Sequence, residues 1–205
     1  MSYDTIVDNN SITKTITALK GKGIEAEVVQ TRAEALTKIK ELIPAGVSVM
    51  NGASVTLEEV GFVDYLKEGK HGWNNLHEAI LAEKDPAKQS ALRRQSVLSD
   101  YYLGSVHALA ETGELVIASN TASQLPHVVF TSPNIIFVVG AQKIVPTLDE
   151  AMKRLREYVV PLEDKHMQDL YGFNTALNKI VIWNGESPMN KRKVRMILVN
   201  EKLGF

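Results

Sequence analysis

Polar side chains that could bind a small molecule lie between two short apolar runs near the middle of the chain. The runs Leu115–Ala118 and Ile135–Val139 are rich in β-branched residues and bounded by turn residues, which is typical of strands. The second run does not alternate, as expected of a strand covered on both faces of a parallel sheet. Open α/β sheets bind ligands in loops beyond strand ends, so we expect Asn120, Ser123 and Gln124 to line a binding site.

Two titratable residues precede the first run and are candidates for catalysis. Glu111 comes just before Thr112 and Gly113, at the entrance to a buried strand, where a carboxylate needs a partner or a task. It could act as a nucleophile or a base. An equally weighted alternative is that its carboxylate only accepts hydrogen bonds from backbone N–H groups. His107 is a candidate general base, although a lone histidine is more often structural. Gly113 is included in the predicted site.

An anion could be held by residues that follow other strand ends. Gly52 and Ser54 lead from an apolar run into Thr56, and a glycine turn before a hydroxyl-rich helix start offers free N–H groups to an anion. The favoured alternative is that both hydroxyls only cap their own helix. Lys143, just beyond the second central run, could hold a phosphate or carboxylate as a point charge, with a helix-capping or solvent role equally weighted.

Composition excludes several classes of site and partner. The net charge of −1 argues against nucleic acid or an anionic membrane as the main partner. The absence of cysteine excludes disulfides, thiolate metal sites and cysteine-held iron–sulfur clusters within these 205 residues. The histidines lack metal-ligand spacing, and no Walker A or Rossmann glycine motif occurs, which disfavours the commonest modes of ATP and NAD binding. No signal peptide or long apolar run is present, so we expect a soluble, cytoplasmic protein.

The elements that must position these residues alternate between helix and strand. Strands are predicted at 24–29, 47–50, 179–183 and 196–199, and capping boxes at Thr31, Thr56 and Thr147 mark helix starts. The helix after Thr147 is expected to end at Pro161, and a further short helix is expected at 163–171. Helices are also predicted at 73–81 and 87–103. The pattern predicts one α/β domain over 1–205, with a parallel-rich sheet between helices and a helical insertion at about 70–105.

Five segments together carry a family resemblance. They are Asn51–Gly61, Ser99–Ser105, Ala110–Val116, Val138–Val145 and Ile197–Phe205. In this order and spacing the chain resembles the LUD (lactate utilisation) domain family, the LutC/YkgG-like group, over nearly its whole length. The resemblance implies a fold like that of ribose-5-phosphate isomerase, glucosamine-6-phosphate deaminase (NagB) and the CoA transferases, and a link to lactate oxidation beside iron–sulfur partner proteins. Some relatives carry a cysteine-rich insert that is missing here, and others have Asn-Ala-Ile where this chain has His107-Ala108-Leu109.

The sequence therefore predicts a site that binds a small anionic metabolite or cofactor in organic-acid metabolism. Ser54, Thr56 and Lys143 would hold the anion, and Glu111 would carry any proton or acyl chemistry. Two alternatives stay open: an acyl-CoA transferase, acyl-CoA hydrolase or folate cyclo-ligase, and a non-catalytic subunit that docks onto an iron–sulfur oxidoreductase. The sequence identifies neither a cofactor nor the oligomeric state, and a homo-oligomer remains open.

Overall fold

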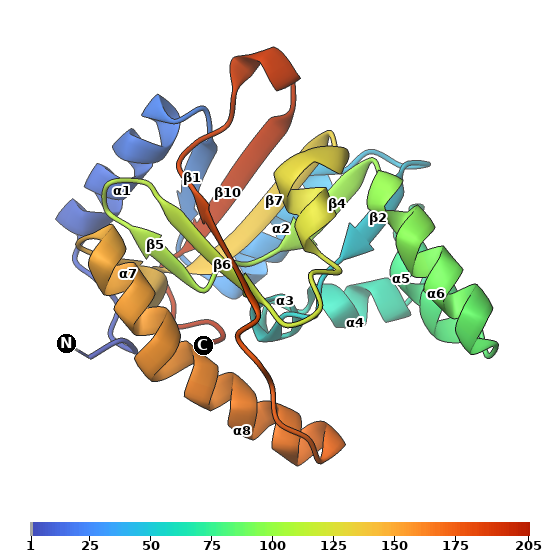
Figure 1. The fold of residues 1–205 in the computed structure, drawn as a ribbon. Helices are drawn as coiled ribbons and strands as arrows, with labels where there is room; N and C mark the ends of the chain where they lie inside the picture. Colours follow the sequence, from blue (N-terminus) through green and yellow to red (C-terminus); the bar gives the residue numbers. More distant parts are fainter. Residues whose placement is uncertain (1) are drawn as a thin grey trace.

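A six-stranded parallel sheet forms the centre of the structure, a computed structural model that describes residues 2–205 (Figure 1). Its strand order is β1-β10-β7-β4-β2-β3. The strands are β1 (Glu25–Val29), β10 (Lys193–Val199), β7 (Asn134–Gly140), β4 (Tyr101–Gly104), β2 (Ser48–Asn51) and β3 (Asn74–Asn75). Each of these strands runs parallel to its neighbours, as the alternation of helices and strands predicts.

Strand β7 confirms that the non-alternating apolar run is covered on both faces. Ile135, Phe137 and Val139 pack into one hydrophobic core with helix α1 (Asn9–Gly21). The intervening Ile136 and Val138 pack into a second core, with helices α2 (Arg32–Leu42), α3 (Val55–Glu59) and α4 (Phe62–Lys67). All five side chains are buried, so this strand is hydrophobic throughout because it has no face toward water.

A second, smaller sheet packs on the α1 side of the parallel sheet. Its order is β8-β5-β6-β9, with β8 (Ile144–Val145), β5 (Ala108–Ala110), β6 (Leu115–Ser119) and β9 (Lys179–Trp183). The pairs β5–β6 and β6–β9 are antiparallel, and β5–β8 is parallel. One face contributes Leu115 and Ile117 to the core shared with β7, and the other contributes Val116 to a core with helix α7 (Leu148–Arg154). The predicted strand at 115–118 therefore belongs to a mixed sheet, beside the parallel one.

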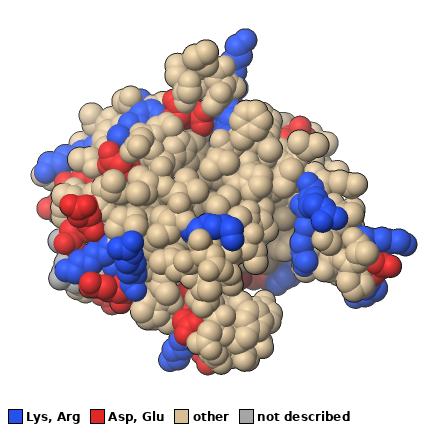
Figure 2. Space-filling view, viewed as in Figure 1, with Lys and Arg blue, Asp and Glu red and all other residues tan. Residues whose placement is uncertain are grey.

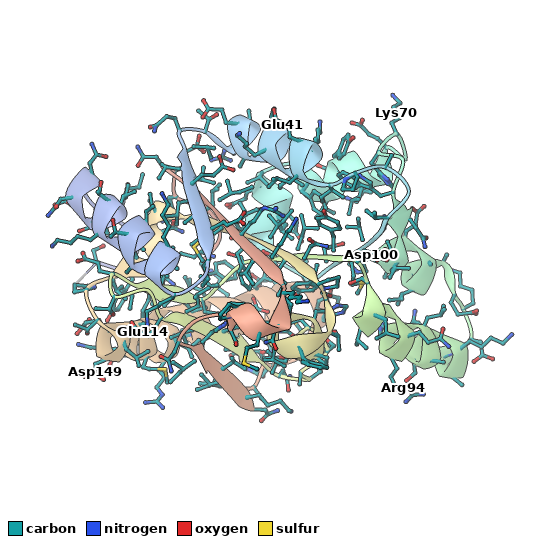
Figure 3. All side chains as sticks on the ribbon, turned by 90° about the horizontal axis from the view of Figure 1, so that it is seen from above. Glu41, Lys70, Arg94, Asp100, Glu114 and Asp149 are labelled. Carbon is teal, nitrogen blue, oxygen red and sulfur yellow. The ribbon has the colours of Figure 1, made fainter. Side chains whose placement is uncertain are left out.

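The helix predicted over 87–103 is wrong at its C-terminal end. Helices α5 (Leu76–Ala82) and α6 (Pro86–Gln95) form the outlying pair, but a short 3₁₀ turn then leads into β4. Tyr101 and Tyr102 match helical spacing by coincidence, because both are buried in a strand between β2 and β7. The helical segment is thus shorter than the predicted insertion at about 70–105. Arg94 lies on α6 at the periphery of the molecule, and its side chain is exposed (Figure 3).

The C-terminal helix continues past the residue that was predicted to end it. Helix α7 runs through a π-helical turn (Leu155–Val159) into α8 (Val160–Tyr171), which extends along one side of the molecule (Figure 1). Pro161 lies in the first turn of α8, directly after the π turn, where the N–H that it lacks is not needed for the regular helical pattern. Within residues 2–205, no helix combines the length and apolar character needed to cross a membrane.

Candidate functional site

A cavity of about 460 Å³ lies where the carboxyl ends of the parallel strands meet the smaller sheet and α8. Its walls come from the segments after β2, β4, β6 and β7, from α8, and from Gly204 and Phe205. This is the edge at which open α/β sheets bind ligands. Eight of the ten predicted site residues line it, namely Gly52, Ser54, Thr56, His107, Asn120, Ser123, Gln124 and Lys143.

Lys143 provides a buried positive charge on the cavity wall. Its Nζ donates to Thr56 Oγ1 at 3.0 Å, Ser105 Oγ at 3.2 Å and the Val106 carbonyl oxygen at 3.2 Å. No ion pair among residues 2–205 includes Lys143, whose side chain is buried. Loss of hydration, aided by the charge of Arg154, lowers its pKa to about 7, although Glu59 opposes the shift. An uncompensated buried ammonium is costly, and an anion in the cavity would relieve that cost.

The two hydroxyls that were expected to share one role have separate ones. Ser54 caps α3, because its Oγ accepts the Leu57 N–H at 3.4 Å. Thr56 was expected to open a capping box, and that expectation is wrong. Its hydroxyl is buried, donates to the Leu203 carbonyl oxygen at 3.3 Å, and accepts from Lys143. Thr56 thus helps to fix the lysine, and Gly204 passes so close to its hydroxyl, with φ +62°, that a Cβ there would clash.

His107 is placed as a hydrogen-bond donor, which revises its predicted role as a base. Its Nδ1 accepts the Ala118 N–H at 3.1 Å, so the ring proton is on Nε2. Burial, together with the charges of Lys143 and Arg154, lowers the pKa of His107 to about 3. The ring is therefore neutral at physiological pH, and His107 is one of the residues that line the cavity.

The polar loop after β6 borders the cavity, but its side chains mostly hold the loop together. Gln124 accepts from Ser119 Oγ at 2.9 Å and donates to the Ala118 carbonyl oxygen at 3.2 Å. Asn120 accepts from Asn178 Nδ2 at 2.7 Å, on the segment that returns from α8. Ala122 adopts φ +68°, a conformation unusual for a residue with a side chain. These bonds define the shape of the wall before any ligand binds.

Glu111 and Gly113 do not line the cavity. They form the turn between β5 and β6, which packs beside α1. Glu111 Oε2 lies 3.8 Å from Lys14 Nζ, and the neighbouring Glu114, which is labelled in Figure 3, pairs with Lys22 at 2.9 Å. Gly113 has φ +92°, and a Cβ there would press on Lys22 and Ala18, so the turn and the contact with α1 require glycine. The structure separates both residues from the predicted site.

Several cavity residues were not predicted from the sequence. The wall formed by α8 includes Glu163, whose pKa is raised by burial and by Glu58, and His166, whose ring contacts Phe205 edge-on at 5.7 Å between centroids. A short helix was expected at 163–171, but because the preceding helix was expected to end at Pro161, nothing placed this helix on the cavity wall. Ser105 was also missed, since the chain before it was read as helical.

Behind the cavity, Arg154 forms a second buried positive charge. Its guanidinium donates to the carbonyl oxygens of His107, Phe205 (3.4 Å) and Tyr3 (3.2 Å). It does not line the cavity. Within residues 2–205, no three His, Asp or Glu side chains gather as a metal site would require. The lining thus offers a ligand the Lys143 cation, the carboxyl groups of Glu58 and Glu163, and neutral hydrogen-bonding groups.

The free end of α8 gives the cavity an apolar rim. Leu170, Tyr171 and Phe173 line it there, and all three side chains are more than half exposed. Figure 2 shows that this face of the molecule is mostly uncharged, including at the end of α8, apart from a basic side chain near its centre and charged side chains toward the periphery. The cavity therefore combines the buried cation of Lys143 with an apolar opening.

Comparison with known proteins identifies a family and a fold. The profile of the LUD domain matches residues 12–200. A crystal structure of a DUF162 family protein from Deinococcus radiodurans superimposes with a TM-score of 0.57 at 14% sequence identity, covering 98% of this chain and 99% of that one. At this identity the likeness concerns the fold. No curated protein matches the sequence.

Proposed function

The chain belongs to the LUD domain family, and from that premise we propose that its cavity binds a small carboxylate-bearing metabolite, or an anionic cofactor, in organic-acid metabolism of the lactate-utilisation kind. The observation that carries this proposal is Lys143, a buried ammonium on the cavity wall with no carboxylate partner among residues 2–205. A carboxylate that replaced the Ser105 hydroxyl as one of its three acceptors would receive a charge-assisted hydrogen bond.

The neighbouring groups support an oxygen-rich ligand of modest size. His107 Nε2–H can donate to a second ligand oxygen, and the hydroxyl of Ser105 lies next to Lys143. A cavity of about 460 Å³ is in the range of small-molecule sites. The apolar rim formed by Leu170 and Phe173 would contact the less polar part of the ligand.

A thermal-shift panel tests the proposal with lactate, pyruvate, acetyl-CoA, a folate, ATP and a sugar phosphate. A ligand present at about 100 times its dissociation constant should add roughly 2.7 kcal/mol of stability. Lys143→Met should weaken binding by about 10- to 100-fold, since a hydrogen bond to a charged group contributes roughly 1.5–3 kcal/mol. The matched control is Lys153→Met, an exposed lysine on α7, which should leave binding unchanged.

The pH dependence adds an independent check on the same ligand. Because the pKa of Lys143 is about 7, the ammonium is lost above that pH, and affinity for an anion should fall as pH rises through this range. Unchanged affinity in Lys143→Met would contradict the proposal. If no compound in the panel raises the melting temperature, the alternative of a non-catalytic subunit docking onto an iron–sulfur oxidoreductase becomes the better explanation.

A further inference from the structure

The side chain of Ser105 places a hydroxyl on the cavity wall. Binding of an anion by Lys143 does not by itself require this hydroxyl. Ser105 directly follows β4 and is half-buried. Its Oγ lies 3.2 Å from Lys143 Nζ, within hydrogen-bond distance. A serine beside a lysine that can lose its proton is an arrangement suited to nucleophilic chemistry, because the amine can remove the hydroxyl proton.

The three partners of Lys143 differ in what they can do when the lysine is neutral. The Val106 carbonyl oxygen can only accept a hydrogen bond. Thr56 donates its own proton to the Leu203 carbonyl oxygen, so toward Lys143 it also acts as an acceptor. A neutral amine has two protons for these acceptors and one lone pair left over. That lone pair can be met by the hydroxyl of Ser105, which would turn from the Val106 carbonyl oxygen, 3.5 Å from its Oγ, and donate to Lys143.

From this geometry we propose that Ser105 and Lys143 form a catalytic dyad that hydrolyses an ester or thioester of a small carboxylic acid. The inference rests on the proposed function in one respect, since it takes the acyl group from the class of acid that the cavity is proposed to bind. It assigns the nucleophile to Ser105, whereas the sequence pointed to Glu111, which lies outside the cavity.

The reaction follows from the positions of the two groups. Lys143 takes the Ser105 proton while Oγ bonds to the acyl carbon, and the tetrahedral intermediate then breaks its bond to the thiol or alcohol, which leaves with the proton from Lys143. Water next attacks the acyl–Ser105 ester and gives a proton to Lys143. Ser105 leaves, takes that proton back, and the free acid is released.

His107 is placed to assist the intermediate. It lies two residues after Ser105 and lines the same cavity, and its Nε2 carries the free proton of the ring. A preorganised donor of this kind stabilises the negative oxygen of a tetrahedral intermediate. The protonation state needed for this role is maintained because the pKa of His107 is about 3.

Two charged groups around Lys143, on α7 and α3, help to set the pH at which the dyad would work. Arg154 on α7 disfavours the ammonium, Glu59 on α3 favours it, and His107 before β5 is neutral. Burial contributes most and lowers the pKa of Lys143 to about 7. Anion binding needs the charged lysine and acyl transfer needs the neutral one, so the two activities should have opposite pH dependences.

The test is covalent labelling of the full chain with a small alkyl fluorophosphonate, followed by mass spectrometry of the labelled peptide. Attack by Ser105 Oγ forms the P–O bond, and fluoride leaves. We expect a single label on Ser105, with a rate that rises as pH increases through about 7 and then levels off. Lys143→Met should slow labelling by at least about 100-fold, the usual contribution of a general base, and Ser105→Ala should abolish it.

Matched controls are Ser90→Ala on α6 and Lys153→Met on α7, which lie outside the cavity and should label as the unmodified chain does. No label on Ser105, a label on a different residue, or a rate independent of pH would overturn the dyad. Should Lys143→Met fail to fold, the site of labelling and the pH profile of the unmodified chain still decide. Anion binding without labelling would refute the dyad and leave the proposed function standing, whereas labelling without anion binding would do the reverse.

Discussion

Lys143 and Arg154 are both buried cations, and neither forms an ion pair among residues 2–205, yet their surroundings differ. Arg154 donates to backbone carbonyl oxygens from three distant parts of the chain, and these acceptors cannot change their protonation. Lys143 binds two hydroxyls and one carbonyl on the wall of a cavity. The same kind of buried charge therefore holds segments together in one place and remains open to chemistry in the other.

The largest expected effect comes from removing the structural cation. Arg154→Met leaves the carbonyls of Tyr3 and His107 without their donor in a buried setting, so we expect a loss of roughly 3 kcal/mol or more in the free energy of unfolding. Chemical denaturation measures this directly. Arg156→Met, on the exposed side of the same continuous helix, should change stability by no more than about 0.5 kcal/mol. If Arg154→Met lowered the free energy of unfolding by less than about 1 kcal/mol, Arg154 would not have the structural role that distinguishes it from Lys143.

A second effect, smaller over any one pH unit than that of Arg154→Met, distinguishes Lys143 by its pH dependence. Its pKa is about 7 in the folded chain and near 10.5 when unfolded, so between these values the unfolded chain binds one more proton. Stability of the unmodified chain should therefore rise with pH in this window, by up to about 1.4 kcal/mol per pH unit from this residue. In Lys143→Met that contribution is absent, so the difference between the two chains should shift between pH 7 and 10. If the free energy of unfolding had the same pH dependence in both chains, burial would not disfavour the charged form of Lys143.

The contrast also shows why part of the site could be predicted from the sequence. Residues that follow strand ends, such as Gly52 and Lys143, were found because parallel strands place their carboxyl ends at one edge. Ser105 was missed because Tyr101 and Tyr102 fit the spacing of a helix as well as that of a buried strand. The sequence therefore did not show that a strand, β4, ends directly before Ser105. Glu111 was wrongly assigned to the site. The local sequence before a strand looks the same whether it leads in from a ligand-binding loop or, as here, forms the β5–β6 hairpin turn that packs beside α1.

The contacts of Arg154 and the place of α8 on the cavity wall could not be inferred from local pattern, although a short helix was expected at 163–171. The partners of Arg154 come from both ends of the chain, and only the folded structure brings Tyr3 and Phe205 together. Glu163 reaches the cavity because the π turn carries the helix past Pro161. Both depend on tertiary packing, which overrides the local signal that a proline ends a helix.

The smallest expected effect is at Glu111, and it tests where the boundary of the site lies. Glu111 pairs with Lys14 at 3.8 Å, and the lysine side chain is 59% exposed, so the pair is largely screened by water. Glu111→Gln should change the free energy of unfolding by no more than about 0.5 kcal/mol. The substitution should also leave anion affinity and Ser105 labelling unchanged, because the hairpin turn does not line the cavity. Titration and labelling of this variant beside Lys143→Met measure both quantities. A loss of either activity in Glu111→Gln would mean that the turn at β5–β6 takes part in the chemistry, and the distinction between a structural hairpin and a functional cavity would no longer hold.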